Sequence, residues 1–229
     1  MNMPTPAQKI PVKWVSLTCT VLSSSKYGLD YDRVKVLHEI GLQNPLQKDE
    51  TFYIPTQGKA IDTRAIFPDG DIVNFAGQRF EDLQDELNQY MEAVKKGDAE
   101  KMDQLHNSFK ALQMLTPVPY KAGTAVLTFD YELALYAKDN IFNLQMWAPM
   151  PSFEVVQGGQ VTASVQLPST NNAVGFRARI LEATGKQLDP QGNQQAEVSK
   201  VLDQDLGLRH MIVWHWANDP LFTVKYQYQ

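Results

Sequence analysis

The feature that most constrains the fold is a series of short β-type segments that fills the chain from residue 124 onward. Each segment is rich in β-branched and aromatic residues, and Gly158-Gly159 has the pattern of a tight hairpin turn. Such a series is typical of a β-sandwich or barrel. The polar connection at 185–205 is expected to be a mobile loop with a short helix at 196–202. The pattern predicts strands at 124–136, 141–147, 152–157, 160–167, 174–183, 209–216 and 221–228.

The N-terminal part of the chain predicts further strands and one short helix. The run 11–22 contains no breaker and would place Val15, Leu17, Cys19 and Val21 on one face of a strand, because side chains alternate between the two faces. The other expected elements are a short helix at 31–41, ending at Gly41, and strands at 52–55, 59–67 and 71–75. A Pro-Asp-Gly turn joins the last two strands, which predicts a hairpin.

Between residues 79 and 115 the hydrophobic pattern changes from that of strands to that of helices. Apolar side chains recur at spacings of three and four, which places them on one face of a helix. A break at Gly97 and Asp98 divides the pattern into two stripes, so the segment predicts an antiparallel helical hairpin. The stripes consist of Phe80, Leu83, Leu87, Tyr90 and Val94, and of Met102, Leu105, Phe109 and Leu112.

Together these patterns predict a mainly β (α+β) fold. We expect a β-sandwich or jelly-roll-like arrangement of antiparallel sheets with an inserted antiparallel helical hairpin at about 79–115. A single β-rich domain over 1–229 is preferred, because no Pro/Gly/Ser-rich linker interrupts the chain. The alternative is an α+β domain at 1–120 followed by a β-sandwich domain at 121–229.

Composition and charge disfavour several classes of partner. The chain has a formal net charge of −5, which disfavours nucleic acid as the main partner because nucleic-acid binding depends on basic surface. No stretch has the length of an apolar membrane span, and no apolar signal-peptide core follows the N-terminus. The one cysteine, Cys19, fits a reducing compartment or a protein stabilised by the size of its core rather than by disulfides. We therefore expect cytoplasmic synthesis without a signal peptide, which is compatible with release in a virion.

No motif in the sequence names a reaction. The chain contains no nucleophile elbow, zinc-binding histidine pair or phosphate loop. His210 and His215 are five residues apart on a predicted strand, which puts them on opposite faces and argues against a shared metal. Asp130 and Glu132 share a predicted strand face and could act as acid and base in a glycosidase, but a solvated strand face is the preferred interpretation. We expect no catalytic residues, no metal and no cofactor.

The most suggestive feature is a group of aromatic residues near the C-terminus. Trp214 and Trp216 fall on one face of the strand predicted at 209–216. An exposed row of aromatic rings can stack on sugars or be buried in a subunit contact. The alternative is that this face belongs to the core. The predicted aromatic binding face consists of Trp214, Trp216, Trp147, Tyr226 and Tyr228.

By elimination, the sequence predicts a non-enzymatic structural or assembly protein that acts through protein–protein contacts, for example a virion or phage particle subunit. Its partners would be further copies of itself or other subunits of an assembly. One alternative is a carbohydrate- or ligand-binding β-sandwich module that uses the aromatic face. The other alternative is a carboxylate-dependent hydrolase, with Asp130 and Glu132 as its acid–base pair.

Overall fold

The computed structural model describes residues 9–55, 59–66, 72–75, 92–93, 95–99, 101, 115–148, 153–170, 177–188, 194–218 and 220–229. Every element delimited in these residues is a strand except η1, a 3-10 helix at Ser24–Tyr27, so the chain is mainly β, as predicted. In this part of the chain no helix is long and apolar enough to cross a membrane. The strands are β1 (Ile10–Leu22), β2 (Tyr31–Leu42), β3 (Glu50–Pro55), β4 (Lys59–Ile66), β5 (Ile72–Phe75), β6 (Leu115–Tyr120), β7 (Val126–Tyr136), β8 (Phe142–Trp147), β9 (Phe153–Pro168), β10 (Ala178–Leu188), β11 (Gln194–Val198), β12 (Lys200–Asp205), β13 (Arg209–Trp216) and β14 (Pro220–Tyr228).

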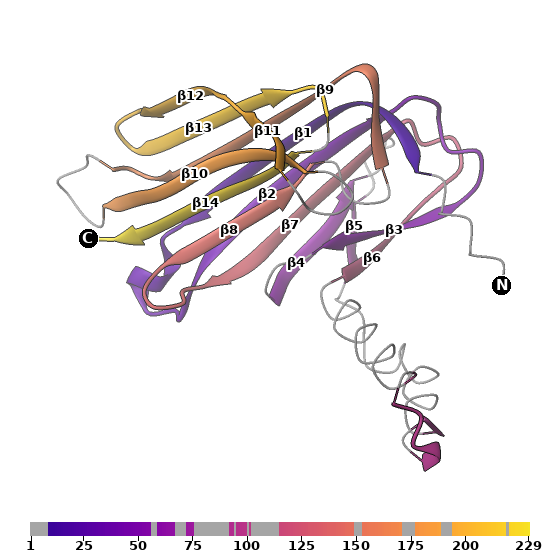
Figure 1. Ribbon diagram of the computed structural model, residues 1–229, viewed down its shortest axis with the longest axis horizontal. Coiled ribbons are helices and arrows are strands. Elements are labelled where there is room, and N and C mark those ends of the chain that lie inside the picture. The colour runs from indigo at the N-terminus through magenta and orange to yellow at the C-terminus, as the bar shows by residue number, and fades with distance from the viewer. Residues whose placement is uncertain are drawn as a thin grey trace.

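These strands form a large sheet, a small sheet and a two-stranded sheet (Figure 1). The large sheet has eight strands in the order β12-β13-β9-β1-β2-β7-β4-β5. The small sheet has four strands in the order β11-β10-β14-β8, and β3 pairs with β6 in the third sheet. The described strand pairs are antiparallel except β1 with β9, which run parallel.

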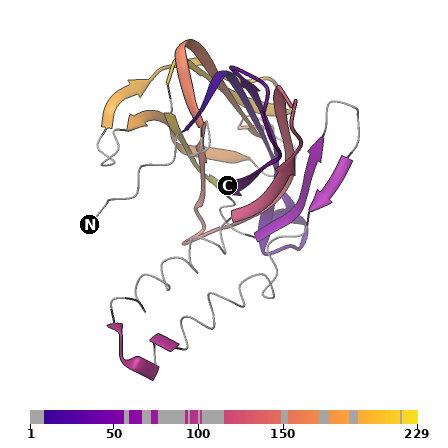
Figure 2. The same ribbon diagram turned by 90° about the vertical axis from the view of Figure 1, so that its right-hand side faces the viewer.

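The core lies between the large and the small sheet, which curve around a common interior (Figure 2). Strand alternation places its side chains there: Val15, Leu17, Cys19 and Val21 of β1 are all buried, as predicted. From the small sheet, β8 and β14 contribute aromatic rings that stack on one another. Removal of this apolar surface from water is the main favourable contribution to folding.

Most of the predicted strands are present within a few residues of the expected bounds. Those at 11–22, 52–55, 124–136, 141–147, 209–216 and 221–228 correspond to β1, β3, β7, β8, β13 and β14. The hairpin predicted from the strands at 59–67 and 71–75 is confirmed by the antiparallel pairing of β4 with β5. The strand predicted at 174–183 corresponds to β10, which begins at Ala178 and continues to Leu188.

The helix predicted at 31–41 is wrong, because this segment is the strand β2 in the middle of the large sheet. Alternate residues of β2 are buried, and two of the buried residues, Asp32 and His38, are polar. A polar residue on the core face interrupts the apolar alternation by which a strand is recognised. Gly41 ends no helix; it lies against Trp14, and a Cβ atom at Gly41 would come within 2.2 Å of the indole Nε1 atom.

The hairpin turn predicted at Gly158-Gly159, between strands at 152–157 and 160–167, is also wrong. β9 continues through both glycines, and its register with β1 shifts at this point, which indicates a β-bulge. Gly158 has a φ of +80°, a conformation that favours glycine. A Cβ atom at Gly159 would come within 2.8 Å of the Lys13 carbonyl oxygen, so the close approach of β1 requires glycine there.

The mobile loop predicted at 185–205 and its short helix at 196–202 are wrong as well. β10 extends into the segment, and β11 and β12 occupy most of its remainder. β11 is an edge of the small sheet and β12 is an edge of the large sheet, so the chain crosses between the sheets here. Edge strands are commonly polar and charged, because one side of each remains open to solvent. The composition that suggested a loop is therefore that of two edge strands.

Most of the helical hairpin predicted at 79–115 lies outside the described residues. Of its helical part, the structure describes 92–93, 95–99 and 101, with helical backbone at 92–93, 95–96, 99 and 101. These residues delimit no complete helix, so the described part of the chain does not support the hairpin, which stays a prediction.

Strands from both halves of the sequence alternate in the large sheet. β1 and β2 precede residue 120, whereas β7, β9 and β13 follow it, and these five strands are neighbours in the order β13-β9-β1-β2-β7. A domain boundary at residue 120 would therefore divide one hydrogen-bonded sheet.

Candidate functional site

Several connections of the fold meet at one end of the two sheets. The parallel strands β1 and β9 both end there, and Leu22 pairs with Arg33 while Pro168 pairs with Arg209. The turn after β1 is therefore close to the turn before β13. We call this region the sheet end; in Figure 1 it is the end that carries the C-terminus. Its described residues are 22–33, 136–142, 168–170, 177–178, 205–210 and 226–229.

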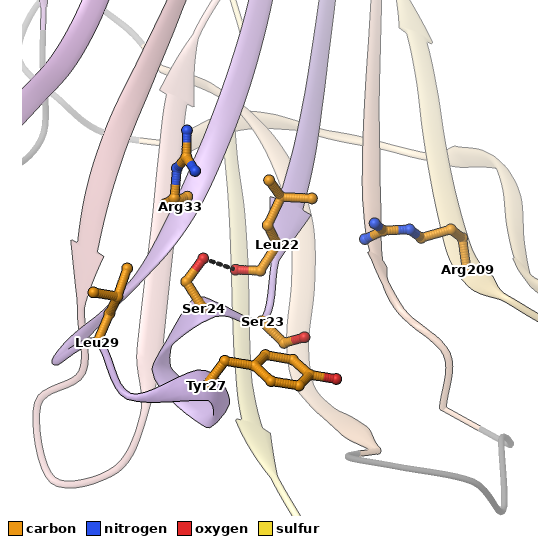
Figure 3. A pocket seen from close by; sticks show the side chains of 7 residues that line it. All are labelled: Leu22, Ser23, Ser24, Tyr27, Leu29, Arg33 and Arg209. Atoms are coloured by element: carbon orange, nitrogen blue, oxygen red, sulfur yellow. Dashed lines mark hydrogen bonds between the residues drawn. The ribbon is translucent and has the colours of Figure 1, made fainter.

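A pocket of about 370 Å³ lies at the sheet end. Figure 3 shows Arg33 and Arg209 on opposite sides of it, with Leu22 between them. Its lining combines apolar side chains, serine hydroxyl groups and two guanidinium groups. The lining residues are Leu22, Ser23, Ser24, Tyr27, Leu29, Arg33 and Arg209.

The two guanidinium groups differ in their partners. Arg33 donates hydrogen bonds from Nε and Nη2 to Glu132 Oε2, so its charge is paired with a carboxylate. Arg209 donates from Nη1 to the carbonyl oxygen of Val21. Among the described residues, no carboxylate oxygen lies within 4.0 Å of the Arg209 guanidinium nitrogens. Of the two cations that line the pocket, Arg209 is thus the one without a carboxylate partner among the described residues.

A buried carboxylate fastens the connection between β1 and β2 to the small sheet. Asp32 Oδ2 accepts hydrogen bonds from the hydroxyls of Tyr226 (2.7 Å) and Tyr228 (2.6 Å). Asp32 Oδ1 accepts them from the amide and hydroxyl of Ser25, at 3.0 and 2.6 Å. Four donors compensate the desolvation of this buried group. Burial and the neighbouring Asp32 raise the pKa of both tyrosine hydroxyls well above its usual range.

A second polar network holds the turn between β12 and β13. Asp205 Oδ2 accepts hydrogen bonds from the Ser169 hydroxyl (2.8 Å) and from the amide and hydroxyl of Thr170 (2.6 and 3.0 Å). Asp205 Oδ1 accepts one from the amide of Gly207 at 2.8 Å. The hydrogen bond from Ser169, with those from Gly207 and Thr170, holds the pKa of Asp205 well below its usual range. Asp205 thus joins the end of β9 to the turn before β13.

His210 extends this network and places a hydroxyl, an imidazole and a carboxylate in a row. Its Nδ1 atom lies 3.1 Å from Thr170 Oγ1, and its Nε2 atom lies 2.7 Å from Asp203 Oδ1. The order resembles that of nucleophile, base and orienting acid in hydrolases. Here the Thr170 hydroxyl is shared with Asp205, and none of these residues lines the pocket. The row joins Thr170, after the end of β9, to the hairpin of β12 and β13.

The sheet end carries much of the exposed apolar surface. Among the described residues, four large apolar side chains are more than half exposed, and three of them, Tyr27 (79%), Leu206 (55%) and Leu208 (81%), belong to the sheet end. Tyr136 and Leu29, also at the sheet end, are 47% and 43% exposed. Apolar side chains that are exposed together mark interaction surfaces, whereas single ones are ordinary.

The predicted aromatic binding face is buried at its centre. Trp214 and Tyr226 are inaccessible to solvent, and the Trp214 ring packs on Phe222 with the centroids 5.1 Å apart. Trp216 and Tyr228 are partly buried against the core. The side chain of Trp147 lies outside the described residues. Trp214 and Tyr226 face the interior between the two sheets, so the alternative interpretation, that this face is core, holds for them.

The carboxylates considered for a hydrolase lie on the same face of β7. Asp130 is half-buried there, and Glu132 is buried. Arg33 binds Glu132 Oε2, and Lys35 Nζ lies 3.6 Å from Glu132 Oε1. Neither carboxylate lines the pocket. Glu132 is thus held in an ion pair with each of two cations.

The histidines and the cysteine form no metal site in the described part of the chain. His215 Nδ1 lies 3.1 Å from Thr162 Oγ1, while His210, on the other face of β13, belongs to the Asp205 network. Within the described residues, no group of three or more His, Cys, Asp or Glu side chains could hold a metal ion. Cys19 is buried, and burial raises the pKa of its thiol.

Sequence reasoning missed the residues that build the sheet end. Asp32 and Arg33 fall in the segment predicted as a helix, and no local pattern connects Arg209 to Leu22. One signal in the sequence could have located Asp32. A carboxylate at a core position of a strand requires buried hydrogen-bond donors, and the hydroxyls of Tyr226 and Tyr228 supply them here.

Comparisons with known proteins leave the chain without an assigned family. No family model matches it, and no curated protein matches it. Among solved structures, it is similar to an M1 zinc metallopeptidase from Deinococcus radiodurans, with a TM-score of 0.42 and 9% identity over 94% of this chain and 42% of that one. A mutant of the same enzyme gives a TM-score of 0.42 at 10% identity, with the same coverage. The chain thus spans less than half the length of these proteins, and a likeness at this level carries no argument about its activity.

Proposed function

We propose that this chain is a non-enzymatic assembly protein that binds other subunits through its sheet end. The observation that carries the proposal is the gathering of exposed apolar side chains on the turns around a pocket. Removing such side chains from water stabilises a contact by about 25 cal/mol per Å² of apolar area. Turns held at the end of a rigid β scaffold are also a frequent position for binding surfaces.

The hydrogen-bond networks of Asp32 and Asp205 support the proposal because they order the turns that carry the apolar side chains. Asp32 holds the connection on which Tyr27 lies. Asp205 holds the turn on which Leu206 and Leu208 lie. A surface that is ordered before binding loses less conformational entropy when a partner arrives.

The state of the acidic groups supports a role without catalysis. Asp32 and Asp205 each accept hydrogen bonds from several donors, and Glu132 is paired with Arg33. A carboxylate that is engaged in this way is poorly placed to exchange a proton with a substrate. The virion setting stays a prediction from the sequence alone.

For the fold, we propose a β-sandwich with a helical hairpin inserted between β5 and β6. The packing of the small sheet against the large one supports the sandwich. The inserted hairpin rests on the two apolar stripes of the sequence between residues 79 and 115.

Light scattering over a concentration series tests the proposed function, with a second copy of the chain as the first partner. We expect the wild-type mass to rise with concentration and Leu208→Asp to keep the protein monomeric, because a charge in an apolar contact must be desolvated. Val201→Asp is the matched control: Val201 is 64% exposed but lies near the start of edge strand β12, away from the sheet end. A monomeric wild type at every concentration, or equal effects of the two substitutions, would count against the proposal.

A further inference from the structure

We infer that the pocket at the sheet end receives a carboxylate of the partner protein, from an aspartate or glutamate side chain flanked by apolar residues. The inference rests on the proposed function and specifies the chemistry of the segment that the sheet end binds.

Arg209 is the group in the pocket that we expect to bind an anion. Its side chain is half-buried in the pocket and donates to the Val21 carbonyl, and within the described part of the chain no carboxylate pairs with it. A guanidinium group has five N–H donors in a planar fork that matches the two oxygens of a carboxylate. The Val21 carbonyl engages one nitrogen of that fork and holds the group beside Leu22, where Figure 3 shows it.

The charge balance of the pocket agrees with an anionic ligand. Arg33 is compensated by Glu132, so Arg209 gives the pocket an excess of positive charge. A carboxylate brought to this site would make a charge-assisted hydrogen bond, which is roughly twice as strong as a neutral one. Ser23 and Ser24 contribute further hydroxyl groups to the lining.

The apolar walls identify the carboxylate as one carried by a polypeptide. Leu22, Tyr27 and Leu29 line the pocket beside the cations, and Tyr27 is largely exposed. These side chains would contact apolar residues on either side of an acidic one. A polyanionic ligand is disfavoured because the chain as a whole carries a net charge of −5.

Nuclear magnetic resonance titration of the full chain with a blocked tripeptide tests the inference. The probe is acetyl-Leu-Asp-Leu-amide, and acetyl-Leu-Asn-Leu-amide is its uncharged match. We expect the aspartate probe to shift the amide signals of Leu22, Ser23 and Tyr27 saturably, with an affinity at least about tenfold higher than that of the asparagine probe. Absence of shifts at the pocket, or equal binding of the two probes, would overturn the inference.

Three variants show whether Arg209 is responsible. Arg209→Gln keeps one donor for the Val21 carbonyl and should weaken aspartate-probe binding roughly tenfold, whereas Arg209→Lys keeps the charge without the planar fork and should give an affinity between those of wild type and Arg209→Gln. Arg179→Gln is the matched control, since Arg179 is exposed on β10 and does not line the pocket. Amide spectra of each variant establish that it is folded. Wild-type affinity in folded Arg209→Gln would overturn the inference.

Two further outcomes separate this inference from the proposed function. Inorganic phosphate that shifts the same signals at lower concentration than the aspartate probe would overturn the carboxylate assignment in favour of a phosphate-bearing ligand. If Arg209→Gln no longer binds the probe but still self-associates, the pocket is not needed for the subunit contact. That result would overturn the inference and leave the proposed function standing. Arg209-dependent probe binding by a strictly monomeric chain would support the pocket assignment while rejecting self-association.

Discussion

The carboxylate of Asp32 on β2 and the hydroxyl of Tyr226 on β14 form a 2.7 Å hydrogen bond that joins the large sheet to the small sheet inside the core. The same carboxylate binds Ser25, which lies in η1 on the connection that forms part of the pocket. Asp32 therefore contributes both to the packing of the two sheets and to the order of the sheet end. A change at this residue is expected to affect stability and binding together.

Replacing Tyr226 with phenylalanine tests this link. Tyr226→Phe removes one of the donors that compensate the buried Asp32 carboxylate, so we expect the free energy of unfolding to fall by about 1–3 kcal/mol. The measurement is urea denaturation followed by fluorescence. Tyr136→Phe is the control, because Tyr136 is nearly half exposed and should tolerate the loss of its hydroxyl. Equal destabilisation by both substitutions would contradict a specific role for the hydrogen bond.

His38 is expected to make the fold sensitive to acid. Burial lowers the pKa of His38 from 6.5 to about 4, and its Nε2 atom has no hydrogen-bond partner among the described residues. In the unfolded chain the His38 imidazole binds a proton as the pH falls below about 6.5, whereas in the folded chain it stays neutral. The free energy of unfolding is therefore at its full value above pH 6.5 and falls as the pH approaches 4. The loss is about 3 kcal/mol, from a pKa difference of 2.5 (6.5 minus 4) at 1.36 kcal/mol per pH unit.

The variant His38→Leu isolates this contribution. Carboxylates also titrate at low pH, so the quantity to compare is the difference between the unfolding free energies of wild type and variant at each pH. We expect this difference to change between pH 6.5 and 4 in favour of His38→Leu. Parallel curves for the two proteins over that range would show that His38 does not titrate on unfolding.

Because Trp14 lies against Gly41, we expect Gly41→Ala to destabilise the protein, although alanine is ordinarily tolerated in a strand. A Cβ atom at Gly41 would lie 2.2 Å from the Trp14 indole Nε1 atom, so Gly41→Ala must displace the ring or the backbone. We expect a loss of about 1–3 kcal/mol in the free energy of unfolding, typical of overpacking. In the background Trp14→Ala the same substitution should have little effect, which a double-mutant cycle measures. Additive effects would exclude the steric cause.

Local sequence patterns determined the strands and their inward faces. In β1, the alternation of Val15, Leu17 and Cys19 with more polar neighbours is enough to predict both the strand and its buried side, because side-chain direction repeats every two residues. The same reasoning located β7, β8, β13 and β14. It failed at β2, where Asp32 and His38 occupy core positions and hide the alternation. It failed again at Gly158 and Gly159, because a bulge inside a long strand and a hairpin turn both favour glycine.

Only the tertiary structure decided which strands are neighbours, and with that the sheet end. Arg209 and Val21 are 188 residues apart in the chain, yet the parallel pairing of β1 with β9 and the pairing of β9 with β13 bring them into contact. Burial of Trp214 and Tyr226 likewise follows from the position of one sheet over the other. Strand propensity arises from neighbouring residues, whereas sheet order arises from the packing of the whole chain, so no local pattern in the sequence contained the pocket.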